Sequence, residues 1–128
     1  MALSRDGSKL YSFGKDDKGQ LGIGQRDRQC PKRCETVPQL VRFPGQETVI
    51  LTDIACGDNH AVAISHGNNV YTWGFGEVDA TGHQTADEVD IWAPTILNLQ
   101  PHVQQDLSTL CIAGGGSRTL LVVANRDA

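Results

Sequence analysis

Few residues in this chain could carry out chemistry, and their spacing assembles no catalytic site. His60 follows Asp58 by two positions, a pairing that acid–base catalysis can use, but no nucleophile or second carboxylate is placed near it in the sequence. The corresponding residue of a related segment, residues 112–122, is Arg118, so the two segments do not share a histidine chemistry. We therefore expect His60 to be a structural residue that ties neighbouring elements together by hydrogen bonds.

Metal and phosphate binding are also disfavoured. Cys30 and Cys34 form a Cys-x3-Cys pair, but Cys56 and Cys111 each stand alone, whereas a zinc site needs a second close pair of ligands. We expect free thiols in a reducing compartment, with no metal and no cofactor. The glycine run at 114–116 lacks the Lys, the Ser or Thr and the helix that follow a phosphate-binding loop.

Charge and hydropathy exclude further classes of function. The formal net charge is −4, with 15 acidic against 11 basic side chains, so the chain has no basic excess with which to attract nucleic acid. No apolar run approaches the ~20 residues of a membrane-spanning helix. The first residues lack the basic and apolar regions of a secretion signal. From the charge and the short apolar runs, we expect neither a membrane nor a direct nucleic-acid partner.

Two segments of the sequence repeat at a long, nearly fixed distance. Residues 10–22 resemble residues 70–82 at an offset of 60, and residues 54–64 resemble residues 112–122 at an offset of 58. Self-similarity of this kind indicates stacked supersecondary units, none of which buries its apolar face alone. The aligned residues of the first pair include Tyr11 with Tyr71, Phe13 with Trp73, Gly14 with Gly74, and Gly22 with Gly82.

The local patterns predict β-strands and no helix. Alternating residue types indicate strands over 9–13 and 69–73, and a tight turn at 57–59 joins strands over 54–56 and 61–64. Further strands are expected over 38–43 and 94–99, each opened by a proline, with surface loops at 25–37 and 84–93. About four short strands in 60 residues, with small residues at 55–57 and 113–115 for a narrow inner strand, fit a propeller blade.

These segments resemble the regulator of chromosome condensation family, whose repeats carry a Y-x-W-G strand, a G-Q-L-G turn and an A-C-G-x-x-H block. Residues 54–64 match the block at every position, and residues 11–22 match the strand and turn well; residues 71–82 have Ala80-Thr81 where Gln-Leu is usual. The residues of this signature are Tyr11, Phe13, Gly14, Gly19, Gly22, Gly57, His60, Tyr71, Trp73, Gly74, Gly82 and Gly115.

The resemblance implies an all-β, incomplete propeller of about two blades out of a probable seven. The register leaves the first repeat without its inner strand, so we expect the chain to be the C-terminal fragment of a longer protein. We divide it into a truncated first repeat over 1–63, which ends in the inner strand of the second, a C-terminal repeat over 64–124 and a polar tail over 125–128. The second repeat is similar to the C-terminal end of the fungal-type Ran exchange factors of this family.

What the resemblance implies for function is nucleotide exchange on a Ran-type small GTPase by protein contact, without enzymatic chemistry, in the nucleus or otherwise the cytoplasm. Histones or chromatin would be contacted through parts outside this chain. The alternative is a scaffold propeller of the same family that does not act on Ran. The turns on one face supply the candidate contact residues, although Asp and Asn in tight turns commonly bond their own backbone. These candidates are Asp16, Asp17, Asp58, Asn59, His60, Glu77, Asp79 and Arg118, with Ser117 beside the last.

We further expect the isolated chain to lack exchange activity and to be marginally stable. A blade taken from a ring leaves sheet faces without neighbours, and we expect Phe13, Leu40, Tyr71 and Trp73 on those exposed faces. Exposed apolar faces beside unpaired edges favour self-association, which the rest of the ring would prevent.

Overall fold

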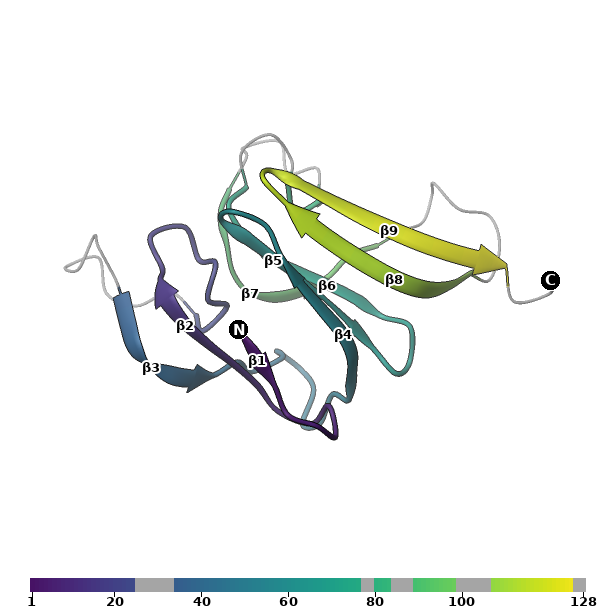
Figure 1. Cartoon of the computed structure of the whole chain (residues 1–128), viewed down its shortest axis with the longest axis horizontal. Helices are drawn as coiled ribbons and strands as arrows, with labels where there is room; N and C mark the ends of the chain where they lie inside the picture. Colours follow the sequence, from purple (N-terminus) through teal and green to yellow (C-terminus); the bar gives the residue numbers. More distant parts are fainter. Residues whose placement is uncertain (25–33, 77–79, 84–88, 99–106, 126–128) are drawn as a thin grey trace.

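The described residues of this chain form nine β-strands, seen here in a computed structural model (Figure 1). The structure describes residues 1–24, 34–76, 80–83, 89–98 and 107–125. The strands are β1 (Ala2–Leu3), β2 (Leu10–Lys15), β3 (Cys34–Leu40), β4 (Leu51–Cys56), β5 (His60–Ser65), β6 (Val70–Gly74), β7 (Ile91–Ile96), β8 (Leu107–Gly115) and β9 (Arg118–Asn125). Within the described ranges, no helix is long and apolar enough to cross a membrane.

The strands form three antiparallel sheets that lie face to face. Their orders are β1-β2-β3, β4-β5-β6-β7 and β8-β9, and the four-stranded sheet lies between the other two (Figure 1). The expected hairpin is present, with Cys56 opposite Ala61 and a hydrogen bond of 2.9 Å from the Gly57 amide to the His60 carbonyl. The all-β, incomplete propeller is thus confirmed: one complete blade stands between two partial ones.

The third strand of each repeat begins earlier than we expected. β3 starts at Cys34 and β7 at Ile91, inside the stretches assigned to loops, and neither strand is opened by its proline. Pro38 and Pro94 instead lie where the pairing with β2 and β6 shifts register, between Ser12 and Gly14 in one sheet and between Thr72 and Gly74 in the other. A proline is tolerated there because both strands lie at a sheet edge and the ladder is already interrupted. Residues 25–33 and 84–88 of the expected loops lie outside the described residues.

Apolar side chains fill both spaces between the sheets. Against the first sheet, the central sheet packs Ala61, Ala63, Tyr71 and Trp73 on Leu10 and Val41; against the third sheet, it packs Val62, Ile64 and Val70 on Ile112. Alternate residues of β5 therefore serve opposite faces, as a strand buried on both sides requires.

The expectation that Tyr71 and Trp73 lie on an exposed face is wrong. They are 2% and 0% exposed, because the first sheet covers them and the Phe43 ring meets both edge-on, with ring centroids 4.9 and 6.3 Å away. Phe13 and Leu40 are exposed, as expected, at 48% and 39%. The boundary that we placed between residues 63 and 64 is one between sequence repeats; it lies within β5 and stays a prediction.

A buried hydroxyl ties down the turn that follows the signature strand in both repeats. Ser12 donates to the carbonyl of Leu21 at 2.7 Å, and Thr72 donates to the carbonyl of Thr81 at 2.6 Å. The first of these turns is also held by the indole of Trp73, which donates to the carbonyl of Gln20 at 3.2 Å. The turns of the two repeats are therefore fixed relative to the sheets.

Candidate interaction surface

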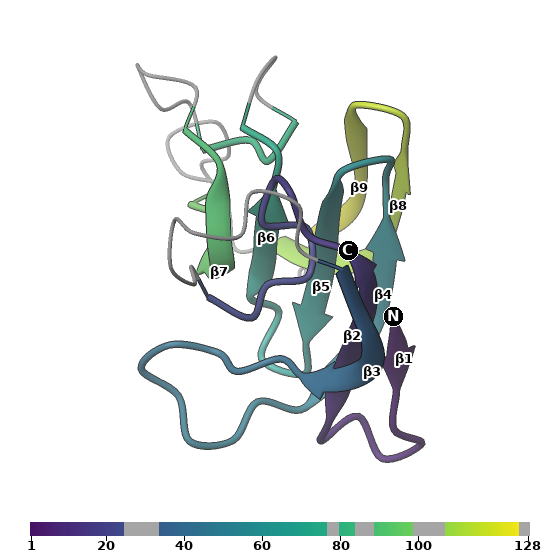
Figure 2. The same ribbon diagram turned by 90° about the vertical axis from the view of Figure 1, so that its left-hand side faces the viewer.

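The turns that carry the expected contact residues gather at one end of the three sheets. The turn after β2, the β4–β5 turn, the segment after β6 and the β8–β9 turn all lie at this end (Figures 1 and 2). Backbone hydrogen bonds join them: the Asp58 amide donates to the Gly116 carbonyl at 3.0 Å, and the Phe75 amide donates to the Asn59 carbonyl at 2.8 Å. The turn after β2 is joined to the central sheet by the Trp73 indole, which donates to the Gln20 carbonyl at 3.2 Å. Because hydrogen bonds connect these turns, the surface that they form is preorganised.

The turn after β2 contains one buried and one accessible carboxylate. Asp16 is 2% exposed and accepts a hydrogen bond from the Leu21 amide at 3.1 Å, so its side chain holds the turn. Asp17 is partly exposed, pairs with the Lys15 ammonium at 2.7 Å and accepts from the Gln20 amide at 2.9 Å. These hydrogen bonds from Lys15 and Gln20 lower the pKa of Asp17 below its usual value.

His60 is buried at the junction between the central and third sheets. It is 2% exposed, and its Nε2 lies 2.8 Å from the hydroxyl of Thr119, which in turn donates to the carbonyl of Ala80 at 3.2 Å. The imidazole and the Thr119 hydroxyl therefore share one hydrogen bond across this junction. Burial lowers the pKa of His60, which favours the neutral ring. Like Asp16, His60 is buried and hydrogen-bonded within the fold.

Sequence reasoning missed a group of side chains that connects the first turn to the segment after β6. The Lys18 ammonium lies 4.9 Å above the Phe75 ring and 4.0 Å from Asp90, whose other oxygen accepts from the Gly76 amide at 3.0 Å. The amide of Gln20 reaches Asn59 at 3.4 Å. Asp90 carried no sequence signal because it falls in a stretch that we assigned to a loop, and Lys18 and Phe75 meet only through the packing of two sheets.

We call the accessible part of this end the turn face. Asp58 and Arg118 are exposed there, and Asn59 is partly exposed, whereas Glu77 and Asp79 lie outside the described residues. This face carries three basic side chains and two acidic ones. The described residues hold no cluster of three His, Cys, Asp or Glu side chains that could bind a metal. The turn face comprises Lys15, Asp17, Lys18, Asp58, Asn59 and Arg118.

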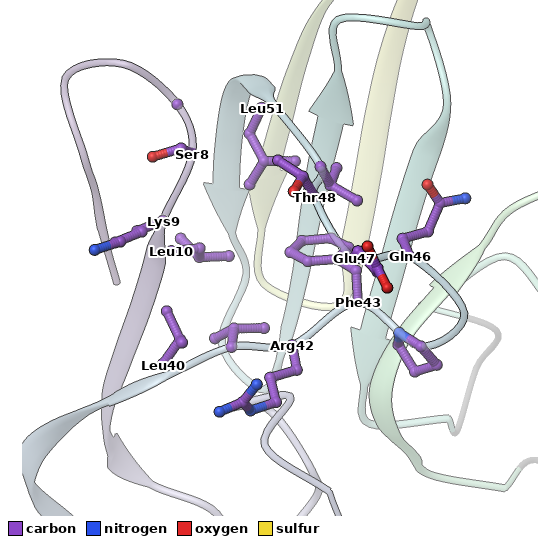
Figure 3. A pocket seen from close by; sticks show the side chains of 14 residues that line it. Ser8, Lys9, Leu10, Leu40, Arg42, Phe43, Gln46, Glu47, Thr48 and Leu51 are labelled. Atoms are coloured by element: carbon purple, nitrogen blue, oxygen red, sulfur yellow. The ribbon is translucent and has the colours of Figure 1, made fainter.

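A cavity of about 720 Å³ opens among other residues, at the start of β2 and along the segment from residue 40 to residue 51. Leu10, Phe43 and Leu51 contribute apolar walls, and Figure 3 shows the charged ends of Lys9 and Arg42 pointing away from them. None of the expected contact residues lines this cavity. We therefore assign it no part in the turn face.

The described cysteines do not form a site either. Cys34, Cys56 and Cys111 are free and exposed, while Cys30 lies outside the described residues. Although part of Cys56 is exposed, desolvation of its thiol by the surrounding protein raises its pKa, which disfavours the reactive thiolate.

Two sequence models of one repeat family match this chain. Both describe the regulator of chromosome condensation (RCC1) repeat, one over residues 8–64 and the other over residues 51–83. Together they span more than half of the 128 residues and include the strands, turns and hairpin that build most of the turn face.

Curated relatives and solved structures agree with this match. The chain is 41% identical over 76 residues to the ultraviolet-B receptor UVR8 of Arabidopsis thaliana, covering 59% of this chain and 15% of UVR8. It is 32% identical over 106 residues to protein RCC2 of Homo sapiens, covering 70% of this chain and 20% of RCC2. The crystal structure of Prp20p from Saccharomyces cerevisiae, described with its binding properties to Gsp1p and histones, is similar with a TM-score of 0.79 and 27% identity, over 96% of this chain and 28% of Prp20p. The chain thus spans only a minor part of each.

Proposed function

Because the chain belongs to the regulator of chromosome condensation repeat family, we propose that it acts by protein–protein contact through the turn face and that its partner is a Ran-type small GTPase. Support comes from the likeness of nearly the whole chain to Prp20p, whose structure is described together with binding to Gsp1p. The resemblance of the second repeat to exchange factors that act on Ran supports the same partner. A nuclear location is part of this proposal, as are histone contacts made outside this chain.

The observation that carries the proposal is that four turns from three sheets are joined into one surface. The bonds from Asp58 to Gly116, from Phe75 to Asn59 and from Trp73 to Gln20 hold the four turns before any partner arrives. A surface that is already ordered loses less entropy on binding than separate loops would. Its mixed charges favour specificity, because a partner must match Asp58 and Arg118 at once.

Exchange by such a surface requires no bond to be made or broken by the protein. If the propeller binds the nucleotide-free GTPase more tightly than the nucleotide-bound form, linkage requires that the nucleotide be held more weakly in the complex. The chain covers 28% of Prp20p, so we assign it one part of such a surface and the full exchange reaction to a longer protein.

Binding of the chain to Ran tests the proposal. We expect the immobilised chain to bind nucleotide-free Ran more tightly than GDP-bound Ran. Replacing exposed Asp58 by Lys should weaken this binding about tenfold, since a charge in contact with a partner is worth one to several kcal/mol. Glu47→Lys is the matched control: it makes the same charge change at an exposed position outside the turn face and should bind like the unmodified chain. No measurable binding to either form of Ran would overturn the proposal. Equal weakening of binding by both variants would show that the contact is not made through the turn face.

A second function is favoured by the 41% identity to a protein that is named as a receptor. In that case the chain belongs to a scaffold propeller that presents the same turn face to a partner other than a GTPase. Binding of Ran in neither nucleotide state by correctly folded chain would support this function over exchange.

A further inference from the structure

The two interfaces between the sheets are copies of one interface. Val70 and Leu97, which pack toward the third sheet, occupy the repeat positions of Leu10 and Val41, which pack toward the central sheet. On the opposite side, Ile112 is the counterpart of Ile54, each packed against the preceding sheet. Each sheet thus has one face that packs on the preceding sheet and a different face that packs on the following sheet. The following-sheet face of one sheet is complementary to the preceding-sheet face of the next.

The two outer sheets are complementary parts of one blade. By repeat position, β8 and β9 correspond to β4 and β5, the first two strands of the complete blade, and β2 and β3 correspond to β6 and β7, its last two strands. Within the described residues β9 is paired only with β8, and β2 is paired on its other edge only through Ala2 and Leu3 of β1. One outer sheet therefore ends at the edge that the other requires.

We propose that a second copy of this chain completes the blade: β8 and β9 of one copy join β2 and β3 of another in the order β8-β9-β2-β3. The pairing of β5 with β6 supplies the register. Val62 opposite Thr72 becomes Leu120 opposite Ser12, and Ile64 opposite Val70 becomes Val122 opposite Leu10. β9 then pairs along the edge of β2 that β1 occupies. By analogy with β5 and β6, at least five cross-strand residue pairs replace the two that β1 makes with β2.

Exposed apolar residues lie where this composite blade would cover them. Leu120 and Val122 are 67% and 50% exposed, whereas their counterparts Val62 and Ile64 are 0% and 2% exposed in the complete blade. Phe13 is 48% exposed, whereas its counterpart Trp73 is fully buried. In the composite blade, Leu120 and Val122 share the face of Leu10 and pack on the central sheet of one copy, and Phe13 packs on the central sheet of the other.

The contact joins two different surfaces, so it is head-to-tail, and successive copies either close into a ring or continue as an open chain. Strand addition at an open edge supplies main-chain hydrogen bonds, and alternate side chains supply the specificity. This inference does not depend on the partner of the turn face.

Sedimentation of the whole chain over a concentration series tests the association. We expect the monomer to give way to dimers and larger species as concentration rises. Leu120→Glu should shift this transition at least tenfold higher in concentration, because it places a charge on the covered face. Ile50→Glu, at a residue 40% exposed in a segment outside the composite blade, is the control and should behave as the unmodified chain. A monomer at every concentration, or equal effects of the two variants, would overturn the proposal.

Disulfide trapping tests the register without depending on stability. In a background with all four native cysteines replaced by serine, a Ser12→Cys chain is mixed with a differently tagged Leu120→Cys chain and oxidised. Leu120 and Ser12 map onto facing residues of adjacent strands, so a mixed disulfide should form. The same Ser12→Cys chain with Leu121→Cys is the control, because Leu121 points to the opposite face of the strand. Equal trapping of both pairs, or of neither by chains with a native strand spectrum, would contradict the composite blade.

Discussion

His60 on β5 and Thr119 on β9 are 59 positions apart in the sequence, and their side chains meet at 2.8 Å across the boundary between two sheets. The hydroxyl of Thr119 in turn donates a hydrogen bond to the carbonyl of Ala80. The buried imidazole therefore takes part in a chain of hydrogen bonds that links the complete blade, the third sheet and the turn of the second repeat. The sequence block that contains His60 therefore serves the joint between blades.

Replacing His60 by Asn should destabilise the chain by about 1–3 kcal/mol at pH 7.5. The reason is that the substitution removes the hydrogen bond between the His60 imidazole and the Thr119 hydroxyl. The loss should shrink as pH falls. The pKa of folded His60 lies below the ordinary value of 6.5, so below pH 6.5 the unfolded state takes up a proton that the folded state does not, and stability declines. Denaturant midpoints of both chains between pH 8 and pH 5, at a monomeric concentration, measure this. A constant difference across that range would contradict it.

Gly22→Ala should destabilise the chain more than Gly45→Ala. Both glycines have positive φ, +68° and +75°, so both substitutions carry the backbone cost of about 1–2 kcal/mol. At Gly22 the added Cβ would lie 2.6 Å from the indole nitrogen of Trp73, whereas at Gly45 no atom lies within 4 Å. The collision should add about 1–3 kcal/mol, as overpacking does in cores. Denaturant titration followed by tryptophan fluorescence compares the two, and equal losses would show that the turn can move away from Trp73.

The carboxyl of Asp6 should titrate near pH 2. Its pKa is lowered from 3.8 to about 2 by hydrogen bonds from the Ser4 hydroxyl and from the amide and hydroxyl of Ser8, at 2.7 to 3.0 Å. The stabilisation from this turn is therefore complete above pH 3.8 and is lost as pH falls through 2. Carbon-13 chemical shifts of the carboxyl group measure the midpoint. Ser4→Ala should move it upward, and a midpoint at 3.8 in the unmodified chain would contradict the bonding.

The isolated chain should not accelerate nucleotide release from Ran. The proposed turn face is one part of a larger surface, and the chain covers 28% of the length of Prp20p. Release of a fluorescent nucleotide from Ran is followed with and without an equimolar amount of the chain. A rate above the spontaneous one would show that these blades suffice for exchange.

Local patterns in the sequence predicted the strands that depend on short-range alternation. The hairpin of residues 54–64 and the strands at Tyr11 and Tyr71 follow from period-two patterns and turn residues, which act over a few positions. The starts of β3 and β7 were predicted wrongly, because Pro38 and Pro94 indicated strand starts at the prolines themselves. The two strands begin earlier, at Cys34 and Ile91. The tolerance of the prolines depends on a register shift in the neighbouring strand, which a local pattern does not contain.

The candidate contact residues differ in exposure, and a local pattern does not predict this difference either. Asp58 and Arg118 were recognised from their turns and are exposed, while Asp16 is in a similar turn and is buried. Residue type and spacing identify a turn, but they do not say which of its side chains faces inward.

By itself, the sequence determined the repeat and the all-β class, because these depend on periodicity and on residue types that recur at fixed offsets. Only the tertiary structure decided that Trp73 is covered while Phe13, in the same repeat position, is exposed. The physical reason is that burial of a sheet face depends on the sheet beside it, and the neighbours of Trp73 and Phe13 differ although their own strands do not.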